Sequence, residues 1–295
     1  MQQKFTISQS VELFLLDAQS RRFTDHTLRF YQERFRIIML WCADHGVTNI
    51  GDLTSTHIRQ FLAYQQSRNL SSSYVHSFAR ALRTLLNFCV RDGIIEISPF
   101  AKVKMPRLEA KILPALSTDE IRAILAKCDS HRDECVVLFM LDSGVRASEL
   151  IELNAGDVDF KTGSVTVHQG KGQKDRITYI GFKTRKRLRA YLILRGDPTG
   201  KEALFVSEKG GARMTYSGLA QMFKRLRKAS GVDECHAHAM RRTFAISCLR
   251  GGMDLYVLAK LMGHSDISVL KFYLDLVKDD LKAAHDNASP VDKII

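Results

Sequence analysis

A run of prolines divides this 295-residue chain into two parts with different secondary-structure patterns. Three of the five prolines stand within sixteen residues of the segment SPFAKVKMPRLEAKILPALS, as Pro99, Pro106 and Pro114. Proline lacks the backbone N–H that an interior helical position needs and restricts the residue before it, so this spacing excludes a continuous helix. We therefore expect a linker over 105–116, between a first domain at 1–104 and a second at 117–295.

Before the linker, polar capping residues alternate with apolar stretches of helical period. Ser8 is expected to cap a helix through VELFLLDAQ, and either Thr24 or Asp25 to cap a second one. Thr54 and a serine cluster beginning at Ser71 precede two further helical stretches. These signals predict a helical first domain.

The stretch after Ser71 combines an apolar face with arginines. Its buried stripe is expected to consist of Val75, Phe78, Leu82, Leu85 and Leu86. Three arginines lie on or near the opposite side, namely Arg80, Arg83 and Arg91. They belong either to an ordinary solvated face or to a surface that follows DNA phosphates, and the sequence leaves both interpretations open.

After the linker the pattern becomes mixed. Ser117 and Glu120 have the spacing of a capping box. Helical periodicity follows at about 118–128, 132–143, 146–153, 183–194, 215–229, 238–250, 254–262 and 266–273. Between these helices, DVDF, SVTVH and RITYI alternate with turn signals and predict a small antiparallel sheet, with Lys171 at the tip of its second hairpin. The expected fold class is mostly α with a small antiparallel β-sheet: a helical N-terminal domain followed by a mixed α+β domain.

The charge balance favours a polyanionic partner. The formal net charge is +12 and the pI is near 9.5. Residues 1–107 carry 14 Lys and Arg against 8 Asp and Glu, and the remainder carries 30 against 24, so each part has a net charge of +6. The excess is therefore not a detachable basic tail, and both parts are able to face the same polyanion.

Cysteine usage and the first residues predict a cytoplasmic protein. The six cysteines are Cys42, Cys89, Cys128, Cys135, Cys235 and Cys248. They form no CxxC pair and most have apolar neighbours, which is typical of free thiols in a reducing compartment. The start MQQKFTISQSVELFLL lacks the apolar core of a signal peptide, and no stretch is long enough to span a membrane.

Several cationic side chains stand in distinctive local contexts. Arg146 follows a glycine-containing turn in DSGVRASEL, which can fix its direction at the start of a helix. His238 and Arg241, in HAMRRTFA, are three residues apart and share a helical face. His264 and Tyr273 follow in GHSDISVLKFY. Each residue alone is more often an ordinary surface or packing residue, and Tyr191 and Tyr256 are expected to be packing tyrosines.

Lys171 lies in GKGQKDR, which is not a Walker A phosphate loop because glycine follows the lysine. A lysine on a hairpin tip in a DNA groove is able to protonate a leaving oxygen, and Lys174 competes with it for that role. His236 and His238 form an HxH pair, but no carboxylate motif or paired-cysteine motif completes a metal site, so we expect none.

In this order the motifs resemble the catalytic domain of the tyrosine recombinase (phage integrase) family, in its compact two-domain, Xer-like or transposon-type form. The first domain is similar, weakly in sequence, to the family's helical core-DNA-binding domain. The resemblance implies that Glu149 supports the first arginine and Tyr273 is the nucleophile. The catalytic positions it implies are Arg146, Lys171, His238, Arg241, His264 and Tyr273. Two departures stand out: Arg242, where many members have a second histidine, and Cys235-His236, where Thr-Pro or Ser-Pro is frequent.

The resemblance also implies an activity and partners. Such an enzyme cleaves and rejoins duplex DNA through a 3′-phosphotyrosyl intermediate and exchanges strands between two recombination sites, without a metal or other cofactor. Its expected partners are double-stranded DNA sites, further copies in a tetramer on synapsed DNA, and accessory DNA-bending or directionality factors, with no membrane. Two alternatives remain: a type IB topoisomerase, which shares the chemistry but rejoins the original strand, and a silent DNA-binding regulator on the same scaffold.

Overall fold

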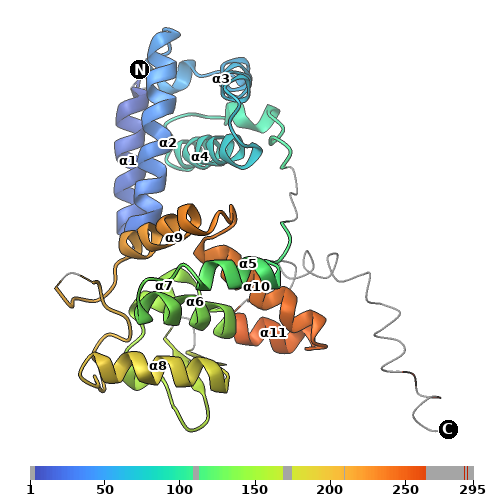
Figure 1. Ribbon diagram of the computed structural model, residues 1–295. Coiled ribbons are helices and arrows are strands. Elements are labelled where there is room, and N and C mark those ends of the chain that lie inside the picture. Colours follow the sequence, from blue (N-terminus) through green and yellow to red (C-terminus); the bar gives the residue numbers. More distant parts are fainter. Residues whose placement is uncertain are drawn as a thin grey trace. The chain divides into compact units, whose positions relative to one another are not determined.

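The computed structural model describes residues 4–108, 113–168, 175–208, 210–263, 289 and 291. The chain divides into two compact units, Met1–Lys111 and Ile112–Ile295, which we describe separately (Figure 1). None of the described helices combines the length and the apolar character that a bilayer crossing requires.

Unit 1 is a cluster of helices around an aromatic core. Its elements are α1 (Ile7–Ser20), α2 (Asp25–Asp44), η1 (Ile50–Asp52, a 3₁₀ turn), α3 (Ser55–Ser67), α4 (Ser72–Arg91) and η2 (Pro99–Lys102, also 3₁₀). The helices α1 and α2 lie side by side, and α4 packs against both (Figure 1). The Phe14 ring makes edge contacts with Tyr31, Phe35 and Phe88 at centroid distances of 5.0, 5.3 and 5.6 Å. The expected α4 stripe is buried, since Val75, Phe78, Leu82, Leu85 and Leu86 are each at most 2% exposed.

The helix starts of unit 1 largely follow the capping signals. Thr24, Thr54 and Ser71 are N-caps of α2, α3 and α4. The prediction that Ser8 caps α1 is wrong. The hydroxyl of Thr6 accepts the N–H of Gln9 at 3.1 Å, and the Gln9 side chain accepts the N–H of Thr6 at 2.9 Å. This capping box starts the helix earlier, so Ser8 falls in its first turn.

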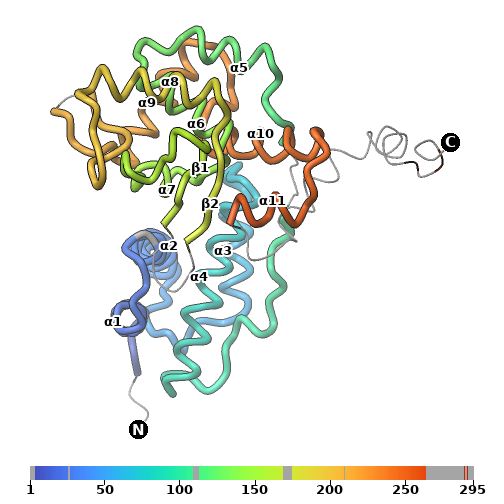
Figure 2. Tube along the Cα trace, turned by 90° about the horizontal axis from the view of Figure 1, so that it is seen from below, coloured from blue at the N-terminus to red at the C-terminus, as the bar shows by residue number. Residues whose placement is uncertain are grey.

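Unit 2 combines helices with one two-stranded sheet. Its elements are α5 (Thr118–Leu125), α6 (His131–Ser143), α7 (Ala147–Glu152), η3 (Ala155–Asp157), β1 (Ser164–Val167), β2 (Arg176–Tyr179), α8 (Phe182–Leu194), α9 (Tyr216–Ser230), α10 (Ala237–Arg250) and α11 (Leu255–Met262). The helix α6 contacts both α8 and α10, and β2 lies beside α11 (Figure 2). The fold class expected from the sequence is thus confirmed, and the expected capping box of Ser117 and Glu120 begins α5.

The sheet is smaller than the strand-like segments suggested. The strands β1 and β2 are antiparallel, from the pair Ser164–Tyr179 to the pair Val167–Arg176. The DVDF segment forms no strand, and only Val158 makes an isolated bridge, to Val165. The cause is local: the Asp157 carboxylate accepts the N–H of Asn154 at 2.7 Å, which stabilises the η3 turn instead of a ladder.

The strand β2 turns its polar side chains inward. Arg176 and Thr178 are buried, whereas Ile177 and Tyr179 are 53% and 55% exposed. The Thr178 hydroxyl donates to the Ser143 carbonyl at 2.8 Å, which ties β2 to the end of α6. This orientation sends the Arg176 guanidinium into unit 2.

The cysteines and tyrosines divide between core and surface. Cys42, Cys89, Cys135 and Cys235 are buried free thiols. Burial raises the pKa of the Cys42 thiol to about 11 and that of Cys135 to about 12, so neither is a ready nucleophile. Tyr191 packs in the core as expected, but the same prediction for Tyr256 is wrong, since it is 66% exposed on α11.

Candidate active site

Arg146 stands at a sharp junction between two helices. Gly144 ends α6 in the left-handed conformation, with φ of 64°, and a side chain there would collide with the ring of Phe244. Val145 is fully buried and anchors the turn. Arg146 is then the N-cap residue of α7, with its side chain 39% exposed. The turn therefore fixes the direction of an arginine that solvent, and hence a ligand, can reach.

Glu149 is the centre to which the nearby arginines bind. Its carboxylate accepts the backbone N–H and one guanidinium N–H of Arg146, both at 2.7 Å. Arg176 binds the same carboxylate through two nitrogens, at 2.8 and 2.7 Å, and Arg241 comes within 3.9 Å. Burial alone raises the pKa of Glu149, but the hydrogen bonds from Arg176 and Arg146 outweigh it and lower the pKa to about 2. Glu149 is therefore ionised at any working pH.

Arg241 is held almost completely inside unit 2. Its side chain is 5% exposed. One guanidinium nitrogen donates to the Gly144 carbonyl at 2.5 Å, and the other donates to the Met262 carbonyl at 2.7 Å. Because α10 carries Arg241 and α6 ends at Gly144, this arginine joins the two helices beside Arg146.

The carboxyl end of α11 binds all three arginines. Arg176 donates to the Leu261 carbonyl at 2.8 Å, Arg241 to Met262 at 2.7 Å, and Arg146 to Gly263 at 3.0 Å. The last carbonyls of a helix lack intrahelical partners and carry its negative dipole end. Three successive main-chain groups and one carboxylate thus position three guanidinium groups. Counting side chains alone, three arginines and Glu149 leave a net charge of +2.

His238 lies one turn before Arg241 on α10 and is open to solvent. It lines a cavity of about 290 Å³ whose wall also includes Ala147, the residue after Arg146. Partial burial, followed by the positive charges of Arg242 and Arg241, lowers the pKa of His238. A neutral imidazole at this place is able to accept a proton or a hydrogen bond.

The structure thus brings Arg146, Glu149 and Arg241 together. His238 lies one turn before Arg241 on α10 and lines the cavity beside Ala147. Lys171, its competitor Lys174, His264 and Tyr273 lie outside the described residues. Across the described part of the chain, no group of three or more His, Cys, Asp or Glu side chains is placed to hold a metal ion.

Arg176 is the site residue that the sequence analysis did not single out. It follows the GKGQKD loop directly, and strand alternation places it on the same side as Thr178. A charged residue at the first position of a short strand is ordinary at a sheet end, so the sequence carries no signal that separates Arg176 from a solvated arginine.

Comparison with known proteins gives a consistent result. Residues 114–279 match the phage integrase family. A tyrosine recombinase XerC of Pseudomonas syringae pv. syringae is 30% identical over 276 residues, with 92% of each chain covered. A tyrosine recombinase XerA of Thermococcus kodakarensis is 28% identical over 274 residues, again with 92% of each chain covered.

Solved structures show the same fold at lower identity. The Tn1549 transposon integrase in complex with transposon right end DNA has a TM-score of 0.75 at 19% identity, over 96% of this chain and 99% of that one. A lambda integrase dimer bound to a COC′ core site also has a TM-score of 0.75, at 17% identity, over 92% of this chain and 78% of that one.

Proposed function

This chain belongs to the phage integrase family and is a site-specific DNA recombinase, and we propose which of its residues carry the chemistry. Tyr273 attacks the scissile phosphate, which forms a 3′-phosphotyrosyl bond and breaks the bond to the 5′-oxygen. Lys171 gives that oxygen a proton, and His238 positions the tyrosine hydroxyl or takes its proton. A 5′-hydroxyl from the partner duplex then reverses the step, so that strands are exchanged through a Holliday junction. No cofactor is needed, since the covalent link preserves the phosphodiester bond energy.

The observation that carries this proposal is the set of arginines around Glu149. Phosphoryl transfer places negative charge on the non-bridging oxygens, and arginine matches that geometry with paired donors. We assign Arg146, Arg241 and His264 to those oxygens. The Arg146 side chain is 39% exposed, so a phosphate can reach it, while the Arg241 and Arg176 side chains are buried and held by several hydrogen bonds.

Glu149 and the end of α11 hold this positive charge in place before DNA binds. A preorganised site loses no free energy in reorienting its donors when the transition state forms. Arg176 binds the Leu261 carbonyl through Nε and the Glu149 carboxylate through its other two nitrogens, so each nitrogen of its guanidinium group already has an acceptor within unit 2. We therefore assign Arg176 and Glu149 to positioning.

The names of the relatives favour recombination over the two alternatives. The XerC and XerA proteins are tyrosine recombinases by name, which supports strand exchange rather than topoisomerase activity or a silent regulator. The Tn1549 and lambda integrases were solved on DNA, and the lambda integrase as a dimer. By analogy we propose double-stranded recombination sites as the substrate, a tetramer on two synapsed duplexes, accessory DNA-bending or directionality factors, and a cytoplasmic location. We further propose that residues 1–104 are a core-DNA-binding domain joined by the 105–116 linker to a catalytic domain at 117–295.

The nucleophile is tested with a nicked suicide substrate that traps the covalent intermediate. Tyr273→Phe should bind this DNA as the parent does and form no adduct, because only the attacking oxygen is lost. Tyr256→Phe is the matched control, since Tyr256 is an exposed tyrosine of α11, and it should form the adduct at the parental rate. An adduct on Tyr273→Phe, mapped by mass spectrometry to another residue, would overturn the assignment.

A further inference from the structure

Two basic side chains near the start of α10 meet at one carboxylate. His236 is the N-cap residue of this helix, and Arg242 lies within it. Oε2 of Glu234 accepts an N–H of Arg242 at 2.9 Å and lies 3.2 Å from Nε2 of His236. The hydrogen bond from Arg242 outweighs partial burial and lowers the pKa of Glu234. Glu234 therefore joins His236 and Arg242 as an anion.

His236 fixes the start of α10. It is the N-cap residue of the helix, and its Nδ1 accepts the backbone N–H of Ala239 at 3.1 Å. An acceptor Nδ1 requires the proton on Nε2, which then donates to Glu234. Ala239 is the neighbour of His238, so this contact orders the turn from which His238 projects.

Arg242 extends the same network to the segment that enters unit 2. Its Nε donates to the Pro114 carbonyl at 2.9 Å, and its side chain is 5% exposed. The next residue, Thr243, accepts the backbone N–H of Leu116 at 2.9 Å through its hydroxyl. The end of the proline-rich segment is thus bound to the helix that carries His238 and Arg241.

Resting on the function proposed above, we propose that Glu234, His236 and Arg242 are positioning residues that hold the first turns of α10, and with them His238 and Arg241, against residues 114–116. Arg242 binds the Pro114 carbonyl and the Glu234 carboxylate through two separate nitrogens of its planar guanidinium group, Nε and Nη2. A lysine would retain the charge, but its donors all lie on one nitrogen, which cannot occupy both places.

The test measures single-turnover cleavage by the full-length protein at saturating suicide substrate. Arg242→Ala should slow adduct formation by about 10-fold to 100-fold, because small misplacements of reacting groups have effects of this order. The dissociation constant for the DNA should stay within about twofold, since no DNA contact is removed. Arg242→Lys should recover part of the rate. Glu234→Gln, at a side chain that is 38% exposed, should change the rate in the same direction with little risk to folding.

Hydrogen exchange provides a readout that does not depend on activity. In Arg242→Ala, peptides covering 113–117 and 236–241 should exchange faster, while a peptide covering α6 should not change.

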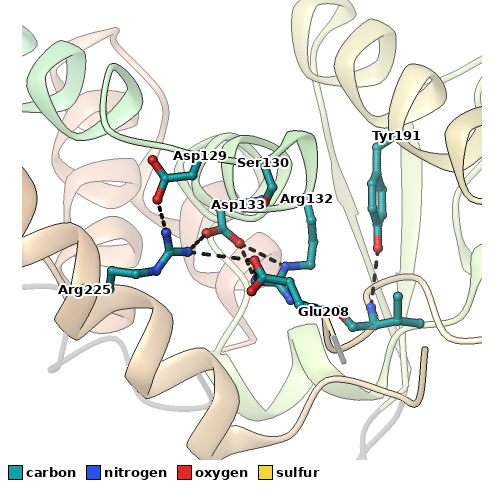
Figure 3. Close-up of polar contacts among 8 residues, drawn as sticks. Asp129, Ser130, Arg132, Asp133, Tyr191, Glu208 and Arg225 are labelled. Carbon is teal, nitrogen blue, oxygen red and sulfur yellow. Dashed lines mark hydrogen bonds and ion pairs between the residues drawn. The ribbon is translucent and has the colours of Figure 1, made fainter. Parts of the chain in front are cut away.

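Arg132→Ala is the matched control. Arg132 is also largely buried, with its side chain 12% exposed, and binds the carboxylates of Asp133 and Glu208 and the Val206 carbonyl (Figure 3). Asp133 keeps its second partner, Arg225, in this variant. Loss of Arg132 should lower the melting temperature without slowing cleavage by the folded protein.

The outcomes separate this inference from the proposed function. If His238→Ala and Arg241→Ala each abolish cleavage while Arg242→Ala and Glu234→Gln cleave at the parental rate, the network has no positioning role. Slower cleavage without faster exchange at 113–117 and 236–241 would also overturn the inference, because Arg242 would then act by direct contact with DNA. If His238→Ala and Arg241→Ala cleave normally, the proposed function itself is wrong.

Discussion

Replacing Arg176 with alanine should destabilise unit 2 strongly and change its response to pH. The substitution removes two charge-assisted hydrogen bonds to Glu149 and one to the Leu261 carbonyl. Loss of one partner from a fully buried ion pair costs about 3–5 kcal/mol. Glu149 keeps two hydrogen bonds from Arg146, so we expect the lower part of that range, about 3 kcal/mol.

The pKa of Glu149 gives the sign of the pH effect. Its pKa is about 2 in the folded protein against an ordinary value of 4.5, so its contribution to stability is complete above pH 4.5 and is lost as the pH falls towards 2. Without Arg176, burial is less opposed and the pKa of Glu149 rises. The stability difference between the parent and Arg176→Ala should therefore be largest near neutral pH and narrow by about 0.5 kcal/mol between pH 7 and pH 4.

Urea unfolding followed by far-UV circular dichroism measures both quantities. The only tryptophan, Trp41, is buried in unit 1, so its fluorescence reports that unit during the same titration. Arg189→Ala is the matched control, because Arg189 also binds one carboxylate, that of Asp197, through two nitrogens, but at the surface. Exposed pairs contribute about 0–1 kcal/mol. If Arg176→Ala cost no more than Arg189→Ala, or if the difference did not narrow in acid, Arg176 would not stabilise the ionised Glu149.

Three further predictions concern the chemistry and assembly. Lys171→Ala should slow cleavage of normal DNA much more than cleavage of a 5′-bridging phosphorothiolate, whose sulfur leaves without a proton, and equal losses would transfer the role to Lys174 or another acid. Cleavage should proceed in excess chelator, because the arginines and Lys171 supply the positive charge that a metal ion would otherwise bring. Loss of cleavage that a divalent ion restores, with DNA binding unchanged, would contradict this. Truncation after Asp275 should leave binding to a single site intact but weaken synapsis and recombination. The spacing of Leu274, Val277, Leu281 and Ala284 predicts one apolar helical face, which would need a surface to bury it. Recombination-competent tetramers of the truncated protein would contradict that role.

The sequence predicted those features that local chemistry determines. Caps such as Thr54 and Ser71 bind their own helix within three residues, so their signals are readable without the fold. The α4 stripe is equally local, because helical period alone places its members on one face. Arg146 and Arg241 were identified from their motifs, and the structure places both against Glu149.

Features that depend on distant partners were not predictable. Arg176 is buried because Glu149, 27 residues earlier, and Leu261, 85 residues later, accept its hydrogen bonds. The usual alternation would place Ile177 and Tyr179 inward, and the opposite occurs. The main-chain acceptors at the end of α11 have no residue-type signature, since any amino acid supplies a carbonyl. Likewise, Arg242 was noted only as a departure until Glu234 and Pro114 were seen to bind it.

The three arginines bound by the last carbonyls of α11 have a consequence for synthesis of the protein. Arg146 and Arg176 leave the ribosome long before Leu261, Met262 and Gly263, to which they and Arg241 bind. Until those residues emerge, the three guanidinium groups lack their acceptors at the end of α11, and Glu149 and Gly144 alone do not fix their final positions. We therefore expect a nascent or prematurely terminated chain to bind DNA through its basic surface without organising a phosphate site. The phosphate site is thus organised only after translation has passed Gly263.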